Sequence, residues 1–281
     1  KLLKMAFLTT FVRYYIKMKD ILKIAICEHD IVRGDALATT KMIEPIIAQY
    51  LESNECDIMI LTEFFSLGFH IGKDNLEDQD GLSLTWLKKM ATDYGVAFVA
   101  SIPIRIDKSD RGVNRAFFVY PDGKFNFYDK RHIFAPGGER EYISPGTSRE
   151  IIHFEGWNIL LQVCYDLRFP VWSRSVDSEY DFVINVANWP QQRISVVDPM
   201  VRTRAIENQA YYAFSNRIGS DDICVYNGNS LISNYLGQSI GERIIIGETN
   251  FLSAEISLSA LKEYNKKFPV KGDSDNFTLN I

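Results

Sequence analysis

The 281-residue sequence has few of the residues that mark several common classes of protein. Its four cysteines lie far apart and form no CxxC pair, so a disulfide scaffold is not expected. Its four histidines form neither an HExxH motif nor a Cys/His cluster, which argues against a zinc site. Because the sequence also has no Gly-rich phosphate loop, we expect neither a metal nor an organic cofactor.

Basic residues are not in excess either. The net charge is −5 and the pI is about 5.5, so no basic stripe is available to neutralise the phosphates of a nucleic acid. Hydrophobic residues make up 46% and charged residues 24%, which is ordinary for a globular protein. We expect a cytoplasmic enzyme with a small-molecule substrate and with neither nucleic acid nor membrane as partner.

The first 17 residues are basic and apolar but match no complete targeting signal. Arg13 and Lys17 interrupt the apolar runs, no small-residue cleavage site follows, and the segment is too short to span a bilayer. Met18 looks like a natural start before a first strand. We therefore expect residues 1–17 to be a non-native or extra extension, an added helix or a weak targeting segment, and residues 18–281 to form a single domain.

Apolar runs and helical patterns alternate along the first half, and strand pairs dominate the last third. The main predicted strands are 21–27, 57–61, 96–106, 115–120, 124–128, 157–163, 181–187, 211–217 and 249–256, and the main predicted helices are 36–53, 82–94, 171–178, 197–209 and 258–267. Gly95 is expected to cap the second helix. This order predicts an α/β fold in which helices lie outside a two-layered sheet structure.

Three residues that follow apolar strands carry the chemistry. Cys164 stands on a tight turn between a strand and Pro170, where a thiol could act as a nucleophile. Glu63 follows the run DIMILT, and a partly desolvated carboxylate there could act as a general base. Lys130 follows FNFYD and could stabilise a thiolate or an oxyanion. Taken one at a time, they could equally be a buried inert thiol, a solvated loop glutamate and a surface lysine.

Together, these residues and their flanking segments resemble the nitrilase superfamily of carbon–nitrogen hydrolases. The three motifs are LTEFFSLGF, YDKRHIF and CYDLRFP, and the similarity continues through VANWPQQR and RTRAIENQAYYAFSNRIG to KFPV. It covers about residues 21–270 and is closest to the omega-amidase branch. The resemblance implies a four-layer αββα sandwich with two mixed sheets, a Glu–Lys–Cys triad, and a homodimer or higher homo-oligomer.

The family often has a second glutamate between the lysine and the cysteine. Glu139 stands seven residues before Gly146, which is the spacing of similar sequences, and Glu141 is the competing candidate. Omega-amidases hydrolyse the terminal amide of small dicarboxylate monoamides such as 2-oxoglutaramate, so a cation is needed for the distal carboxylate. Arg193 is the first choice, because a guanidinium fits a carboxylate bidentately. Arg168 is the alternative, although its closeness to Asp166 suggests a structural ion pair instead.

The resemblance implies amide hydrolysis through a cysteine thioester, with the backbone N–H of Tyr165 sharing the oxyanion with Lys130. Trp189 and Phe64 are expected to wall the pocket, although Trp189 could also be plain core. The remaining cysteines are expected to be structural, and the pair Glu28–His29 is expected to lie at the surface. Other activities of the superfamily, such as a nitrilase, an N-carbamoyl amidase or a metabolite-repair amidase, and a non-catalytic metabolite-binding scaffold remain as alternatives.

Overall fold

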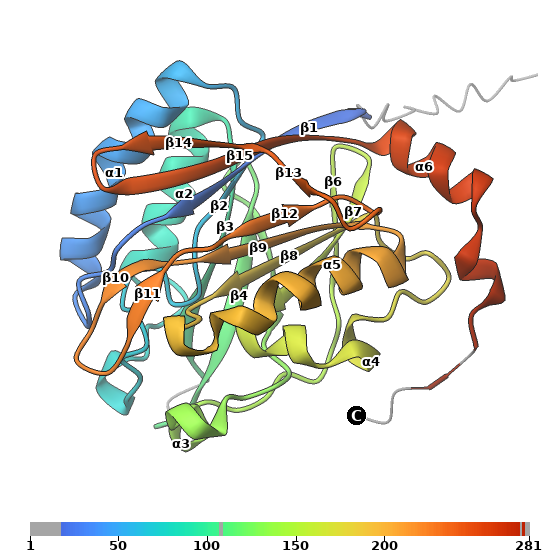
Figure 1. The fold of residues 1–281 in the computed structure, drawn as a ribbon. Coiled ribbons are helices and arrows are strands. Elements are labelled where there is room, and N and C mark those ends of the chain that lie inside the picture. Colours follow the sequence, from blue (N-terminus) through green and yellow to red (C-terminus); the bar gives the residue numbers. More distant parts are fainter. Residues whose placement is uncertain (1–17, 107–108, 276, 279–281) are drawn as a thin grey trace, which may run out of the picture.

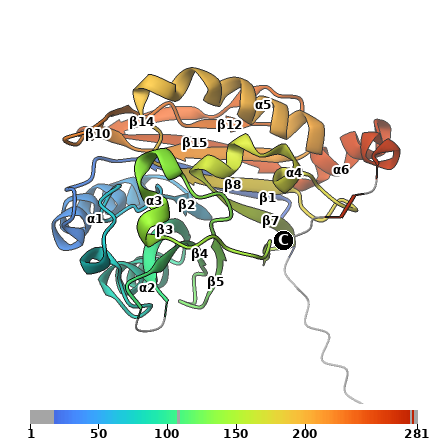
Figure 2. The ribbon, with the colours of Figure 1, turned by 90° about the horizontal axis from the view of Figure 1, so that it is seen from below.

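We analysed a computed structural model of the protein, which describes residues 18–106, 109–275 and 277–278. The prediction for residues 1–17 lies outside the described residues. Two large sheets lie face to face, and helices cover their outer faces (Figures 1 and 2). The predicted αββα sandwich with two mixed sheets is confirmed.

The first sheet has seven strands in the order β14-β15-β1-β2-β3-β4-β5. Its strands are β1 (Ile21–Glu28), β2 (Ile58–Ile60), β3 (Ala97–Arg105), β4 (Gly112–Val119), β5 (Phe125–Asp129), β14 (Glu242–Ile246) and β15 (Thr249–Ser257). The central strands β1, β2 and β3 are parallel, and their neighbours at both sides are antiparallel. Parallel strands are covered on both faces, which is why β2 and β3 are almost continuously apolar in sequence.

The second sheet has six strands in the order β13-β12-β9-β8-β7-β6, with parallel β7, β8 and β9 at its centre. Its strands are β6 (Ile151–Phe154), β7 (Trp157–Val163), β8 (Phe182–Ala187), β9 (Tyr211–Asn216), β12 (Leu231–Ser233) and β13 (Ser239–Ile240). A separate hairpin, β10 (Ile218–Ser220) with β11 (Val225–Asn227), was not predicted. One core cluster contains residues from the facing sides of both sheets, and we therefore propose that residues 18–281 form one domain.

Helices α1 (Ala36–Ser53) and α2 (Leu82–Tyr94) cover the outer face of the first sheet, and α5 (Val197–Asn208) covers the second (Figure 2). The remaining helices are α3 (Glu139–Tyr142), α4 (Pro170–Ser173) and α6 (Leu258–Lys267). Gly95 caps α2 with φ 66°, in the left-handed conformation that glycine adopts most easily. No helix in the described part of the chain is long and apolar enough to cross a membrane.

Two local predictions were wrong. The helix predicted over 171–178 ends at Ser173, because the backbone of Arg174 is extended, with ψ 125°. Glu28 and His29 are buried rather than exposed. Glu28 accepts from Arg243 at 3.0 Å, and both ring nitrogens of His29 lie within hydrogen-bond distance of backbone carbonyls. Arg243 is far away in the sequence, so a local sequence pattern does not reveal why Glu28 is buried.

Candidate active site

The centre of the site is a buried ion pair between Glu63 and Lys130. Glu63 lies just beyond the carboxyl end of β2, and Lys130 directly follows β5. Both side chains are fully buried, and the ammonium of Lys130 donates to Oε1 of Glu63 at 2.8 Å. The other carboxylate oxygen, Oε2, accepts the backbone N–H of Asn188 at 2.9 Å. Buried charges persist only when they are paired and hydrogen-bonded, as they are here.

Glu139 completes the buried cluster. It is the first residue of α3, and its carboxylate accepts from Lys130 at 2.9 and 3.0 Å and from the backbone N–H of Phe134 at 2.7 Å. Glu141, the competing candidate, is exposed, so the structure brings Glu139 and not Glu141 to Lys130. Burial raises the pKa of Glu139, and the Lys130 charge opposes that rise. Burial alone would lower the pKa of Lys130, but the charges of Glu139 and Glu63 raise it above its usual value.

Asn114, on β4, bridges the two carboxylates. Its side-chain amide donates to Oε1 of Glu63 at 2.8 Å and to Oε1 of Glu139 at 2.9 Å, and the side chain is fully buried. Its backbone carbonyl also accepts the N–H of Lys130 at 2.9 Å. Asn114 was not among the predicted site residues, although a lone amide inside the run GVNRAFFV is a signal, since a buried polar side chain needs partners.

Cys164 reaches the same cluster from the second sheet. It follows β7 directly and begins a short 3₁₀ helix, Cys164–Arg168, with φ 45°. Burial raises the pKa of the thiol well above its usual value; the charge of Glu63 adds to the rise, and Lys130 opposes it. A thiol in this position stays protonated until a base accepts its proton, and Glu63 is the adjacent base.

Cys164 lies at a pocket of about 350 Å³. The pocket is lined mainly by aromatic and positively charged side chains: Phe69, Phe134, Tyr165, Arg168, Trp189 and Arg193. Asp221, Cys224 and Tyr226, from the β10–β11 region, also line it. A concave, mostly apolar pocket with a few polar groups is typical of a small-molecule site. Cys224 therefore borders the site, whereas Cys27 is fully buried in β1.

The two arginines of the pocket face aromatic rings instead of acids. The guanidinium of Arg168 lies 5.1 Å from the centre of the Trp189 ring, and that of Arg193 lies 4.9 Å from the centre of the Phe134 ring. Among the described residues, neither guanidinium forms an ion pair with a carboxylate. The expected ion pair of Arg168 with Asp166 is therefore absent, because Asp166 is engaged by other donors. Two unpaired cations in one pocket favour an anionic ligand.

Two aromatic predictions differ in outcome. Trp189 lines the pocket, and its Nε1 donates to the carbonyl of Arg193 at 2.8 Å. Phe64 does not line it; its ring packs behind Phe69, which does, at a centroid distance of 5.7 Å. Phe64 has φ 45° and is fully buried, so the backbone turn after Glu63 directs its ring into the core.

No cluster of three or more His, Cys, Asp or Glu that could hold a metal occurs among the described residues.

Comparison with known proteins identifies the family of the chain. Residues 23–266 match the family model of the carbon–nitrogen hydrolases. An omega-amidase, YafV, from Yersinia enterocolitica is 36% identical over 92% of this chain and 98% of its own length. A 2-oxoglutaramate amidase from Bacillus subtilis is 31% identical over 89% of this chain and 96% of its own length.

A crystal structure of a related protein has the same fold. It is a CN-hydrolase superfamily protein from Xanthomonas campestris with an arsenic adduct in its active site. Its TM-score is 0.84 at 33% identity, and the match covers 94% of this chain and all of that one (100%). The family model alone spans most of the described residues, and the chain is a member of the carbon–nitrogen hydrolase family.

Proposed function

We propose that the protein hydrolyses the terminal amide of a small dicarboxylate monoamide, of the 2-oxoglutaramate type, to the acid and ammonia. The observation that carries the proposal is the position of Cys164, which lies beside the buried Glu63–Lys130 pair and opens into a pocket with two unpaired arginines. The names of the relatives from Yersinia enterocolitica and Bacillus subtilis point to the same class of substrate.

The proposed reaction starts at the thiol. Glu63 accepts the proton of Cys164 as Sγ attacks the amide carbonyl, and a tetrahedral intermediate forms. The ammonium of Lys130 and the backbone N–H of Tyr165 stabilise its oxyanion. Glu63 then returns the proton to the leaving nitrogen, the C–N bond breaks, and ammonia leaves a thioester on Cys164.

Water completes the cycle. Glu63 removes a proton from the water that attacks the thioester, and the C–S bond breaks to give the acid and the free thiol after proton return. Glu139 holds the ammonium of Lys130 in place throughout, through the contacts at 2.9 and 3.0 Å. The cluster has two carboxylates and one ammonium. When Glu63 accepts the thiol proton, its negative charge is lost and one appears on the sulfur and then on the substrate oxygen, so the number of charges in the site stays the same.

The distal carboxylate of the substrate would bind a guanidinium. Both arginines line the pocket; Arg193 is exposed, and Arg168 is half-buried and ends the 3₁₀ turn that Cys164 begins. With Asp166 engaged elsewhere, the reason for ranking Arg193 above Arg168 no longer holds, and both are proposed as anion ligands. Trp189 and Phe134 keep the two cations in place by their ring faces.

A panel of amides tests the proposal. It contains 2-oxoglutaramate, a neutral amide of equal length, an N-carbamoyl amine and a nitrile, with ammonia release measured for each and the acyl adduct on Cys164 detected by intact mass. Fastest turnover of 2-oxoglutaramate with a thioester adduct supports the proposal. Release of ammonia from the N-carbamoyl compound but not from 2-oxoglutaramate would show another activity of the superfamily.

We also propose a homodimer or higher homo-oligomer in the cytoplasm. Val171 in α4, Ile206 in α5 and Leu236 are exposed apolar residues on the helical side of the second sheet and the loop beside it, which suits an interface between copies. All four cysteines are free thiols, as in a reducing compartment. Light scattering after gel filtration measures the stoichiometry, and a monomer at micromolar concentration would reject the interface.

A further inference from the structure

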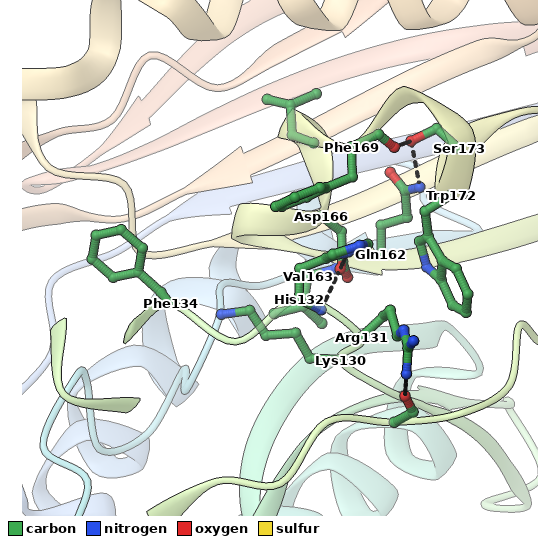
Figure 3. A network of polar contacts seen from close by, with 12 residues as sticks. Lys130, Arg131, His132, Phe134, Gln162, Val163, Asp166, Phe169, Trp172 and Ser173 are labelled. Carbon is green, nitrogen blue, oxygen red and sulfur yellow. Dashed lines mark hydrogen bonds and ion pairs between the residues drawn. The ribbon is translucent and has the colours of Figure 1, made fainter. Parts of the chain in front are cut away.

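The carboxylate of Asp166 joins the two chain segments that carry Cys164 and Lys130 (Figure 3). Asp166 is fully buried in the 3₁₀ turn, two residues after Cys164. Its Oδ1 accepts the backbone N–H of His132 at 3.0 Å and lies 2.8 Å from Nδ1 of the His132 ring. Since His132 stands two residues after Lys130, this oxygen connects the nucleophile turn to the lysine segment.

The second oxygen of Asp166 makes a matching connection. Oδ2 accepts the backbone N–H of Val163, the residue before Cys164, at 3.0 Å. It also accepts the hydroxyl of Tyr128, two residues before Lys130, at 2.8 Å. The carboxylate therefore accepts four hydrogen bonds, which satisfies a buried charge and fixes its orientation.

The surrounding groups leave the turn little freedom. The Tyr128 hydroxyl also accepts from Nε1 of Trp172 at 2.9 Å and from the N–H of Arg131 at 3.0 Å. The His132 ring stacks on Phe169 at 3.6 Å with an interplanar angle of 4°. Cys164 has φ 45°, a conformation that a residue other than glycine keeps only when its surroundings hold it.

We propose that Asp166, acting through His132 and Tyr128, is a positioning residue that sets the separation of the Cys164 thiol and the Lys130 ammonium. This inference rests on the proposed thioester chemistry. Asp166, His132 and Tyr128 are not among the residues that line the pocket, so their loss should lower kcat and leave KM little changed. A displacement of about 1 Å between reacting groups can cost about 100-fold in rate.

Two substitutions of His132 separate the hydrogen bond from ring packing. In His132→Asn the side-chain amide can place an N–H near the position of Nδ1 but loses the stacked ring. In His132→Phe the ring stays against Phe169 but cannot donate to Asp166. We expect kcat to fall by up to about 100-fold in His132→Phe and to stay close to wild type in His132→Asn. His153→Phe is the matched control, because its ring bonds Asn158 on the surface at 2.8 Å.

Asp166→Asn tests the carboxylate itself. It keeps the shape, but its amide group cannot accept from two of the present donors, so we expect a fall of kcat by about 100-fold or more. Asp181→Asn is the control, since Asp181 also accepts a backbone N–H, that of Asn158 at 3.0 Å, but precedes β8 at the end opposite to the site. It should leave kcat unchanged.

The value of kcat is calculated per functional active site. The number of functional sites is the amount of Cys164 that is carboxymethylated without substrate and protected from carboxymethylation by substrate. The melting temperature is measured in parallel. Loss of sites with normal kcat per site, or better activity in His132→Phe than in His132→Asn, would overturn the positioning role. If the wild type hydrolyses none of the proposed amides, the proposed function fails. The comparison then uses the rate of Cys164 carboxymethylation, which Lys130 favours, and equal rates in the two His132 variants would reject the inference.

Discussion

The ammonium of Lys130 lies 3.0 Å from Oε1 and 2.9 Å from Oε2 of Glu139, and both side chains are fully buried. The contact is nearly symmetric, so both oxygens of the Glu139 carboxylate accept hydrogen bonds from the ammonium. The ammonium also donates to Glu63. This arrangement gives Glu139 a specific task that can be measured separately from that of the general base.

The variant Glu139→Gln should lower kcat by about 100-fold or more, because a preorganised charge that holds an oxyanion ligand typically has effects of this size. KM should change little, since Glu139 does not line the pocket. Steady-state kinetics on the best amide of the panel measures both values. Glu141→Gln is the matched control two residues away, and it should keep wild-type activity because Glu141 is exposed. Equal loss in both variants would contradict the assignment.

The bridge made by Asn114 predicts an order of effects. Asn114→Ala removes a donor from Glu63 and Glu139 and should lower kcat, since each carboxylate loses one buried hydrogen bond. Asn114→Asp should be worse, because it places a third carboxylate against the two already present, and like charges in a buried site disfavour ionisation. Activity and thermal melting, compared across the two variants, check this order. An Asn114→Asp variant as active as Asn114→Ala would show that the bridge carries no electrostatic role.

The thiol should show an alkaline pH profile in the absence of substrate. Burial and the charge of Glu63 raise the pKa of Cys164 well above its usual value. A raised pKa moves the formation of thiolate to higher pH, so the rate of carbamidomethylation by iodoacetamide should rise about tenfold per pH unit between about pH 7 and 9. Peptide mapping separates Cys164 from Cys224, and Cys164→Ser supplies the blank. A rate that levels off below about pH 8 would mean that the thiolate is already formed.

The pocket arginines should act on substrate binding. Replacing Arg168 or Arg193 by Met should raise KM for a substrate with a distal carboxylate by about 10- to 100-fold, which corresponds to the loss of a hydrogen bond to a charged group. KM for the neutral amide of equal length should stay the same. Arg202→Met is the control, because Arg202 pairs with Asp198 on the surface of α5. If both substrates are affected equally, the arginine shapes the pocket and does not bind the carboxylate.

The sequence predicted much of this site because its chemistry follows strands. Glu63, Lys130 and Cys164 each come after an apolar run, and the motifs around them resemble one family, so the resemblance implied that they would lie close together. The spacing to Gly146 also distinguished Glu139 from Glu141. The paired strands came from periodicity, and the turn at Gly95 came from the preference of glycine for positive φ.

Other features depend on contacts between distant segments and left little local signal. Asn114 is one amide within an apolar strand. Its role in the site becomes visible only when its hydrogen-bond partners, which are 51 and 25 residues away in the sequence, are known. Asp166 stands two residues before Arg168, yet it bonds to Tyr128 and His132 instead. In the sequence, Glu28 looks like a surface residue. In the structure it is paired with Arg243, which is 215 residues later in the chain. Phe64 was misplaced because the positive φ after Glu63 was not anticipated.

The division of the site between the two sheets has a consequence for the folding chain. The acid–base side, with Glu63, Asn114 and Lys130, belongs to the first sheet and its loops, and the nucleophile belongs to the second. A chain in which only one sheet has formed holds either a base without a thiol or a thiol without a base. Hydrolysis therefore requires both sheets to be folded and packed against each other.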